Sequence, residues 1–258
     1  MKIMKSLFLI ASLFLTACGH FDKFALDEVF SDPQAIELCK AIQTGNTEKI
    51  DQLLKEGIDI NTVGRDGLNP LLWLFLKNGE TENKKISFKH LLKKGADPLE
   101  IYTPLNLTLF HLTAGYADPD YLKMILETDP NIDINLEIKD QMFSTPLLQA
   151  LAAHQYANFK LLLDHGANIE KKRWNGNTPL MMSAGNGTWK FAYLLLQRNA
   201  DYNYAKNRLL WTLENLVYHP SVSIEIDGTD YRQKVIDFLR EKGVEVNPWM
   251  PEDEVFSD

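Results

Sequence analysis

A phrase of the sequence, Leu161-Leu162-Leu163-Asp164-His165-Gly166-Ala167-Asn168, recurs along the 258-residue chain. It returns as Leu91-Leu92-Lys93-Lys94-Gly95-Ala96-Asp97 and as Leu53-Leu54-Lys55-Glu56-Gly57-Ile58-Asp59, with further copies at residues 125–135, 195–201 and 238–247. The equivalent residues are spaced by 38, 36, 35, 33 and 44 positions, and they are Gly57, Gly95, Asn131, Gly166, Asn199 and Gly243. A period of this size indicates stacked structural repeats.

Each copy predicts the end of one helix and, further on, the start of another. The paired leucines end an amphipathic helix, and the glycine or asparagine behind them tolerates the positive φ that closes it. Thr145-Pro146-Leu147 and Thr178-Pro179-Leu180 open new helices, because threonine caps a helix and proline in its first turn loses no hydrogen bond. One such unit cannot bury its apolar face alone, so neighbouring units must stack.

These motifs resemble the ankyrin-repeat family, whose first helix opens Thr-Pro-Leu-His-x-Ala-Ala and whose second helix ends Leu-Leu-x-x-Gly-Ala. The resemblance covers about residues 34–247; Asn69-Pro70-Leu71 matches in part, and Thr108-Leu109-Phe110-His111 lacks the proline. It implies an all-α ankyrin-repeat solenoid of about six helix-turn-helix units, with atypical terminal units. Spacing alone places the first helix of the last unit at residues 211–217.

Residues 1–17 have the pattern of a secretory signal peptide. Lys2 and Lys5 precede an uncharged apolar run over residues 7–17. A helix that crosses a bilayer needs about 20 apolar residues. This run is shorter, so we expect the segment to be cleaved.

Leu15-Thr16-Ala17-Cys18-Gly19 resembles a bacterial lipobox. The resemblance implies that Cys18 is acylated and holds the protein on the periplasmic side of the outer membrane, since Gly19 replaces the aspartate typical of inner-membrane retention. Several acyl chains give a durable anchor. The alternative is an ordinary signal peptide with a chance cysteine. The expected organisation is a signal peptide (1–17), a lipidated tether (18–33), a repeat domain (34–247) and an acidic tail (248–258).

Composition and motifs argue against catalysis and nucleic-acid binding. The formal charge is −8, with 35 acidic and 27 basic residues, which is unsuited to a polyanionic partner. The six histidines are scattered, and no nucleophile elbow or phosphate-binding loop is present. We therefore expect no catalytic residues, no metal and no other cofactor. Two polar insertions, at residues 78–85 and 219–230, are expected to be surface loops.

Two further residues have structural interpretations. His111 stands in the slot where ankyrin units carry a histidine that makes structural hydrogen bonds. Cys39 falls in the first helix, where a small buried apolar residue is expected; a reactive sensor thiol is the alternative.

The resemblance points to a concave face, formed by the first helices and the loops before them, as the place where a partner protein docks. An apolar strip is expected there, made of Trp73, Leu112, Tyr116 and Met182. The loop tips add Tyr102, Phe143, Arg173 and Trp174, the last two in the basic stretch of residues 171–174. Tryptophan and tyrosine often dominate binding energy at interfaces. The alternative is that the helical side chains pack between neighbouring units.

Ankyrin-bearing lipoproteins of this layout resemble immunity proteins paired with type VI secretion phospholipase effectors. The resemblance implies a non-enzymatic protein that binds and inhibits a secreted phospholipase toxin where its lipid substrate lies. The alternative is a periplasmic scaffold or accessory factor for envelope or oxidative-stress proteins.

One motif has no place in the repeat. Asp27-Glu28-Val29-Phe30-Ser31-Asp32 recurs unchanged at residues 253–258. Either two acidic flanking segments coincide, or the hexapeptide is a linear motif with an anchoring phenylalanine that docks on this protein or on a partner.

Overall fold

The computed structural model describes residues 25–77, 79–139, 141, 143–215 and 228–247. The predicted signal peptide, Cys18 and the acidic tail lie outside the described residues. So does most of the insertion at 219–230. The chain divides into two compact units, one up to Gln141 and the other from Met142 onward.

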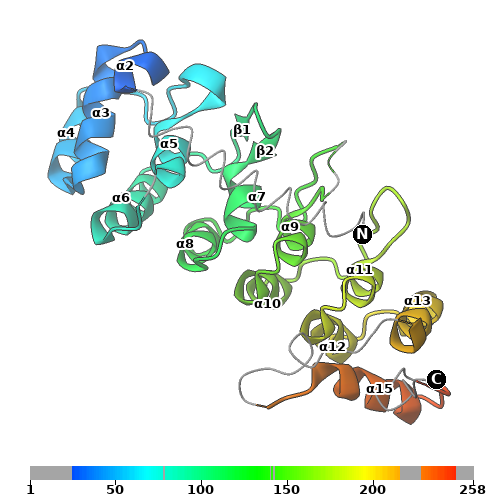
Figure 1. Ribbon diagram of the computed structural model, residues 1–258. Coiled ribbons are helices and arrows are strands. Elements are labelled where there is room, and N and C mark those ends of the chain that lie inside the picture. The colour runs from blue at the N-terminus through cyan, green and yellow to red at the C-terminus, as the bar shows by residue number, and fades with distance from the viewer. Residues whose placement is uncertain (1–24, 78, 140, 142, 216–227, 248–258) are drawn as a thin grey trace, which may run out of the picture. The chain divides into compact units, whose positions relative to one another are not determined.

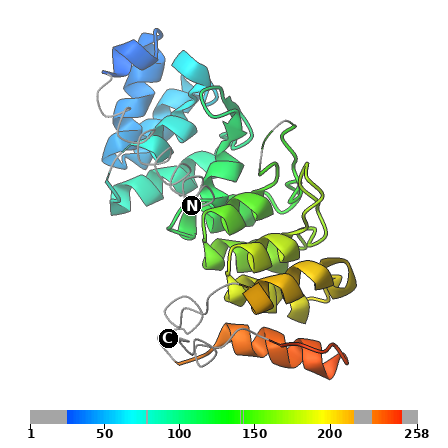
Figure 2. The same ribbon diagram turned by 45° about the vertical axis from the view of Figure 1, so that its right-hand side comes forward.

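Each unit consists mainly of helix pairs whose two members lie side by side (Figures 1 and 2). The first unit contains α2 (Leu26–Val29), α3 (Pro33–Thr44), α4 (Thr47–Lys55), the 3-10 turn η1 (Arg65–Gly67), α5 (Pro70–Leu76), α6 (Glu82–Lys93), α7 (Leu109–Ala114) and α8 (Asp120–Thr128). The second contains α9 (Pro146–Ala152), α10 (Tyr156–Asp164), α11 (Pro179–Gly185), α12 (Trp189–Gln197), α13 (Tyr202–Asn215) and α15 (Tyr231–Glu241).

The predicted helix openings are confirmed. The Thr145 hydroxyl accepts a hydrogen bond from the Leu148 amide, and Thr178 does the same for Met181. Proline occupies the first position of both helices, where no intrahelical hydrogen bond is lost.

Most of the predicted helix ends are also confirmed. Gly166 (φ 84°) and Asn199 (φ 64°) both adopt the left-handed conformation that closes the preceding helix. Asn131 does not, so the prediction is wrong for that copy. There α8 ends at Thr128, and the residue that follows, Asp129, has a more extended backbone (φ −122°, ψ 86°) because Pro130 comes next and disfavours helical geometry.

The described residues also contain one short hairpin, in the loop that precedes α7. Strand β1 (Ile101–Tyr102) pairs antiparallel with β2 (Leu107–Thr108), with Ile101 opposite Thr108 and Tyr102 opposite Leu107. The hairpin leads directly into the first helix of a pair, so it fixes where that helix begins.

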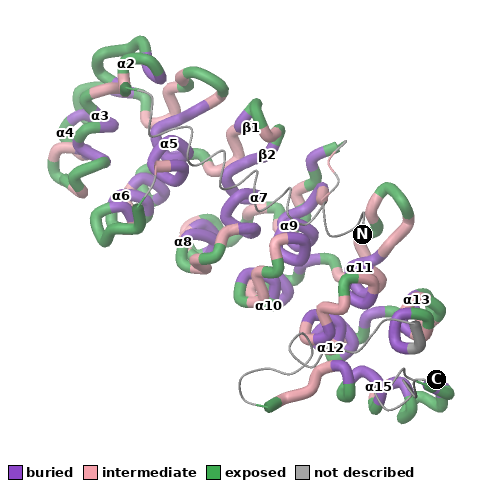
Figure 3. Tube along the Cα trace, in the orientation of Figure 1, coloured by how far each residue is buried: buried purple, intermediate pink, exposed green. Residues whose placement is uncertain are grey.

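The core of each unit lies between its helices (Figure 3). Every residue of α5, α7 and α9 is buried. In the first unit, Phe75 and Phe88 both pack edge-on against Tyr121, with ring centroids 5.3 and 4.8 Å from it. In the second unit, Phe159 packs against Phe191 at 5.0 Å. Such aromatic contacts add to the free energy gained by burial.

Part of the expected tether is folded. Asp32 caps α3 by accepting a hydrogen bond from the Gln34 amide, and α2 lies directly before it. Val29 and Phe30 are buried at the open end of the first helix pair. Folded structure therefore begins at about residue 26, inside the segment 18–33 that the sequence predicts to be a tether.

The first helix of the last pair begins earlier than spacing predicts. α13 starts at Tyr202, nine residues before position 211, and the Asp201 carboxylate accepts a hydrogen bond from the Tyr204 amide in its first turn. The Arg232 side chain of α15 donates a hydrogen bond to the Leu213 carbonyl of α13 over 3.0 Å. This bond ties the two helices together in the described part of the last pair.

Candidate functional site

Exposed aromatic and basic side chains gather on the second unit. The loop between α10 and α11 turns tightly, because the Gly176 amide donates to the Arg173 carbonyl and the Arg173 amide donates to the Asn177 carbonyl, both over 2.9 Å. Trp174 lies at the tip of this turn and is 78% exposed. Burying so large an apolar surface would favour binding, so the turn presents an interaction anchor.

Helix α13 adds two more exposed aromatic residues, Tyr204 and Trp211. The Tyr204 hydroxyl donates to the Gly176 carbonyl over 3.2 Å, which joins the helix to the loop. Trp211 lies two turns further along and on the same face, because seven residues are nearly two full helical turns. Tyr204 is 46% exposed and Trp211 is 51% exposed. The loop and the helix thus both present exposed aromatic side chains on the second unit.

Cations lie over these rings. The Lys172 ammonium is 4.0 Å from the centroid of Tyr204, and the Arg173 guanidinium is 4.8 Å from that of Phe143. Burial lowers the pKa of Arg173. Stacked cations hold aromatic rings in place and keep positive charge at the surface. We call these six residues the aromatic-basic surface: Phe143, Lys172, Arg173, Trp174, Tyr204 and Trp211.

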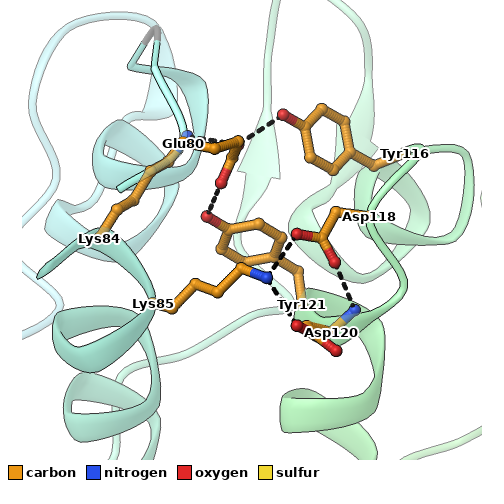
Figure 4. A network of polar contacts seen from close by, with 7 residues as sticks. All are labelled: Glu80, Lys84, Lys85, Tyr116, Asp118, Asp120 and Tyr121. Atoms are coloured by element: carbon orange, nitrogen blue, oxygen red, sulfur yellow. Dashed lines mark hydrogen bonds and ion pairs between the residues drawn. The ribbon is translucent and has the colours of Figure 1, made fainter. Parts of the chain in front are cut away.

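A polar network in the first unit binds an inserted segment to α8 (Figure 4). The Glu80 carboxylate accepts hydrogen bonds from the hydroxyls of Tyr116 (2.6 Å) and Tyr121 (2.5 Å). The Lys84 ammonium lies 3.2 Å from the same carboxylate and donates to the Lys77 carbonyl. Lys84 is 5% exposed, so the expectation of a wholly surface-exposed insertion at residues 78–85 is wrong.

The electrostatics of this network favour fixed charges. Burial raises the pKa of Glu80, but hydrogen bonds from both tyrosines and the nearby Lys84 ammonium outweigh it and bring the pKa below its ordinary value of 4.5. Burial and the hydrogen bond to this carboxylate raise the pKa of Tyr121. Lys85 also bridges Asp118 and Asp120, with both distances 2.6 Å. Near pH 7 the Glu80 carboxylate therefore stays ionised and the Tyr121 hydroxyl stays protonated, which indicates a structural role for the network.

His111 makes the structural hydrogen bonds expected of it. Its Nε2 donates to the Leu136 carbonyl over 3.1 Å, and its Nδ1 lies 2.8 Å from the Thr108 hydroxyl. The side chain is fully buried. The histidine therefore fastens the loop around residue 136 to the start of α7.

A family model described as "Ankyrin repeats (3 copies)" matches residues 110–206. The putative ankyrin repeat protein YahD of Escherichia coli (strain K12) is 27% identical over 195 residues, covering 62% of this chain and 94% of that protein. The chain carries ankyrin repeats. Such repeats are protein-binding scaffolds, so the fold implies protein–protein interaction.

Two longer proteins match as well. The nuclear factor NF-kappa-B p105 subunit of Gallus gallus is 25% identical over 163 residues, which cover 62% of this chain and 16% of that protein. The neurogenic locus notch homolog protein 1 of Danio rerio is 28% identical over 164 residues, 59% of this chain and 6% of that protein. The matches thus span a small part of these relatives.

The ankyrin repeats bury most of the expected apolar strip. Trp73, Leu112 and Met182 are each 5% exposed or less. They lie on first helices whose other side chains are also mostly buried, so the burial favours the alternative that they pack within the array. Tyr116 is partly exposed but engaged with Glu80, and Tyr102 is buried in strand β1. Partner binding by these residues stays a prediction.

Three of the expected loop-tip residues do come together. Phe143, Arg173 and Trp174 all belong to the aromatic-basic surface. Sequence reasoning missed Tyr204 and Trp211, because spacing placed the helix that carries them nine residues too late. Their separation by seven residues could have indicated that both side chains lie on one face of a helix.

The buried cysteine and the acidic and histidine side chains of the described residues give no sign of a reactive or metal-binding site. Cys39 is fully buried, and burial raises the pKa of its thiol far above the ordinary value, which disfavours the sensor interpretation. Among the described residues, no group of histidine, cysteine, aspartate and glutamate side chains is placed to hold a metal ion. A search of the same residues finds no helix with the length and apolarity needed to cross a bilayer.

Proposed function

We propose that this chain is a lipid-anchored, periplasm-facing ankyrin protein that binds a partner protein through the aromatic-basic surface. The observation that carries the proposal is the exposure of Trp174, Tyr204 and Trp211 together on a protein-binding fold. Tryptophan, tyrosine and arginine are the residues most often found at the energetic centre of an interface. Positive charge on an otherwise acidic protein favours a partner with an acidic patch.

We further propose that the partner is a secreted phospholipase of a type VI system, which this protein inhibits as its immunity protein. The support is the sequence layout: a lipobox at residues 15–19 followed by ankyrin repeats. An anchored inhibitor stands in the same layer as the lipid that the toxin attacks. Anchoring raises its effective concentration there, so modest affinity suffices for capture.

A pull-down from the protein's own cells tests this partner. The bait is the chain lacking residues 1–18, and recovery of a phospholipase whose activity on lipid vesicles the bait abolishes is the expected result. Recovery of envelope-stress or oxidative-stress proteins without a lipase would overturn the immunity role and support the scaffold alternative.

Substitutions test the surface independently of the partner's identity. We expect Trp174→Ala and Tyr204→Ala each to weaken binding about thirtyfold, the effect of losing an interface anchor worth about 2 kcal/mol. Val63→Ala is the matched control, because Val63 is 56% exposed but belongs to the first unit. If Trp73→Ala and Trp174→Ala both leave binding intact, neither the concave strip nor the aromatic-basic surface is the docking face.

A further inference from the structure

The hexapeptide at residues 27–32 occupies a defined site on the first helix pair. Val29 is 4% exposed and Phe30 is 2% exposed, whereas Asp27, Glu28, Ser31 and Asp32 face solvent. The segment is held by an α-helical turn in which the Phe30 amide donates to the Leu26 carbonyl over 2.8 Å. Two apolar side chains are therefore inserted, and the acidic residues on either side remain in water.

Gly64 forms part of the wall of this site. A methyl group added at Gly64 would lie 2.5 Å from the Val29 carbonyl oxygen and 2.8 Å from Cδ1 of Phe30. Gly64 has a φ of −92°, which any residue can adopt, so glycine is needed there for space and not for its backbone freedom. Bare backbone at this point lets the hexapeptide lie against it, and a side chain would push it out.

The same six residues, in the same order, end the sequence at 253–258, outside the described residues. We propose that the site around Gly64 recognises this sequence itself, and that its second ligand is the hexapeptide 253–258 of another copy of this chain. Val255 and Phe256 then take the places of Val29 and Phe30. Asp32 remains the cap of α3, because it is bonded directly to Pro33.

In this proposal the second hexapeptide makes the same contacts at the site as the first. The two differ only in how each is connected to the repeats. The first copy precedes Pro33 directly, so its effective concentration at the site is in the millimolar range or above. The hexapeptide 253–258 therefore binds the site when residues 27–32 are displaced or when the protein concentration is high. The resulting contact joins the N-terminal site of one molecule to the C-terminus of the next, an open head-to-tail arrangement.

Removing the resident anchor gives the most direct test. We expect the full chain with Phe30→Ala, kept in detergent, to form larger species in sedimentation velocity as its concentration rises. The matched control carries Phe30→Ala and also lacks residues 253–258, and it stays monomeric. Equal sedimentation of the two variants overturns the proposal.

A peptide probe tests recognition at the site. A fluorescent peptide of residues 252–258 is expected to bind the Phe30→Ala chain at least tenfold more tightly than the unaltered chain, whose site is occupied. Phe256→Ala in the peptide, or Gly64→Ala added to the chain, abolishes that binding. Equal binding to the Phe30→Ala chain with and without Gly64→Ala overturns the assignment.

Hydrogen exchange on the unaltered chain covers the case in which Phe30→Ala does not fold. Millimolar peptide is expected to speed exchange of the amides in residues 26–30 and to leave residues 64–68 protected, because one copy replaces the other. Unchanged exchange in residues 26–30 at saturating peptide overturns the proposal.

Discussion

Lys84 and Glu80 show how single side chains can fix an insertion in place. The Lys84 ammonium lies between Glu80 and the rings of Phe75 and Tyr121, at 5.9 and 5.6 Å from their centroids. A buried ammonium without partners would be costly, so the carboxylate, the Lys77 carbonyl and the rings together make its burial possible. These contacts hold the segment in place, and its last four residues form the first turn of α6, which Thr81 caps.

Glu80→Gln is expected to make the stability of the protein less dependent on acid. The folded-state pKa of Glu80 lies below its ordinary value of 4.5, so its charge stabilises the fold above that value and this contribution is lost as the pH falls through the folded pKa. Urea unfolding should show a difference in stability between Glu80→Gln and the unaltered chain at about pH 7, and this difference should shrink as the pH falls through the folded-state pKa of Glu80, which lies below 4.5.

Glu82→Gln is the control for this prediction. Glu82 is an exposed carboxylate two residues further on, in the first turn of α6, and no hydrogen bond joins it to either tyrosine. A gap that closes in the same way for both variants would contradict the role given to Glu80.

The ends of the second helices show that one sequence slot can have two backbone conformations. Asn199 and Asn131 occupy the same position of the repeat and are both exposed, but Asn199 alone of the two has a positive φ. The left-handed conformation costs a residue other than glycine or asparagine about 1–2 kcal/mol. Pro130 keeps the residue before it, Asp129, out of helical geometry, so α8 does not end in a left-handed residue as the helix before Asn199 does.

Asn199→Ala is therefore expected to lower the free energy of unfolding by about 1 kcal/mol, whereas Asn131→Ala should change it by less than about 0.5 kcal/mol. Asn199→Gly should be tolerated, since glycine adopts a positive φ without penalty. Denaturant unfolding of the three variants measures this, and equal losses for the two alanine variants would contradict it.

Local patterns explain what the sequence could predict at the level of elements. Thr145, Thr178 and Gly166 act on neighbours a few residues away, so their roles can be read directly from the chain. Burial of Trp73 and of Lys84 depends on residues distant in sequence, which periodicity does not identify. The same holds for the insertion of Phe30 beside Gly64, where the motif was visible but its site was not.

The candidate site was predictable to a similar extent. The basic stretch around Arg173 and Trp174 stands out in the sequence because the rest of the chain is acidic. Its contacts with Phe143 and Tyr204 come from segments about thirty residues away on either side. These contacts depend on how the repeats stack, so the sequence alone could not predict that Phe143 and Tyr204 lie beside the basic stretch.

For the whole molecule, the proposed lipid anchor at Cys18 can be tested directly. We expect Cys18→Ser to abolish labelling by radioactive palmitate. Because thiol acylation precedes cleavage in a lipobox, the variant should either keep its signal peptide or, if the signal peptide is removed, appear in the soluble fraction of the cell. Cys39→Ser is the control, since Cys39 is buried in α3. Membrane retention of the Cys18→Ser protein with its signal peptide removed would contradict the anchor.

The docking of Val29 and Phe30 on the first repeat has a consequence for reach. Eight peptide units separate residue 18 from residue 26, where α2 begins, and they span at most about 29 Å when fully extended. With Cys18 in the bilayer, the first repeat stays within that distance of the lipid headgroups. Release of the hexapeptide would add six residues to this connection, so in a protein anchored at Cys18 the occupancy of one small site would set how far from the membrane the repeats can reach.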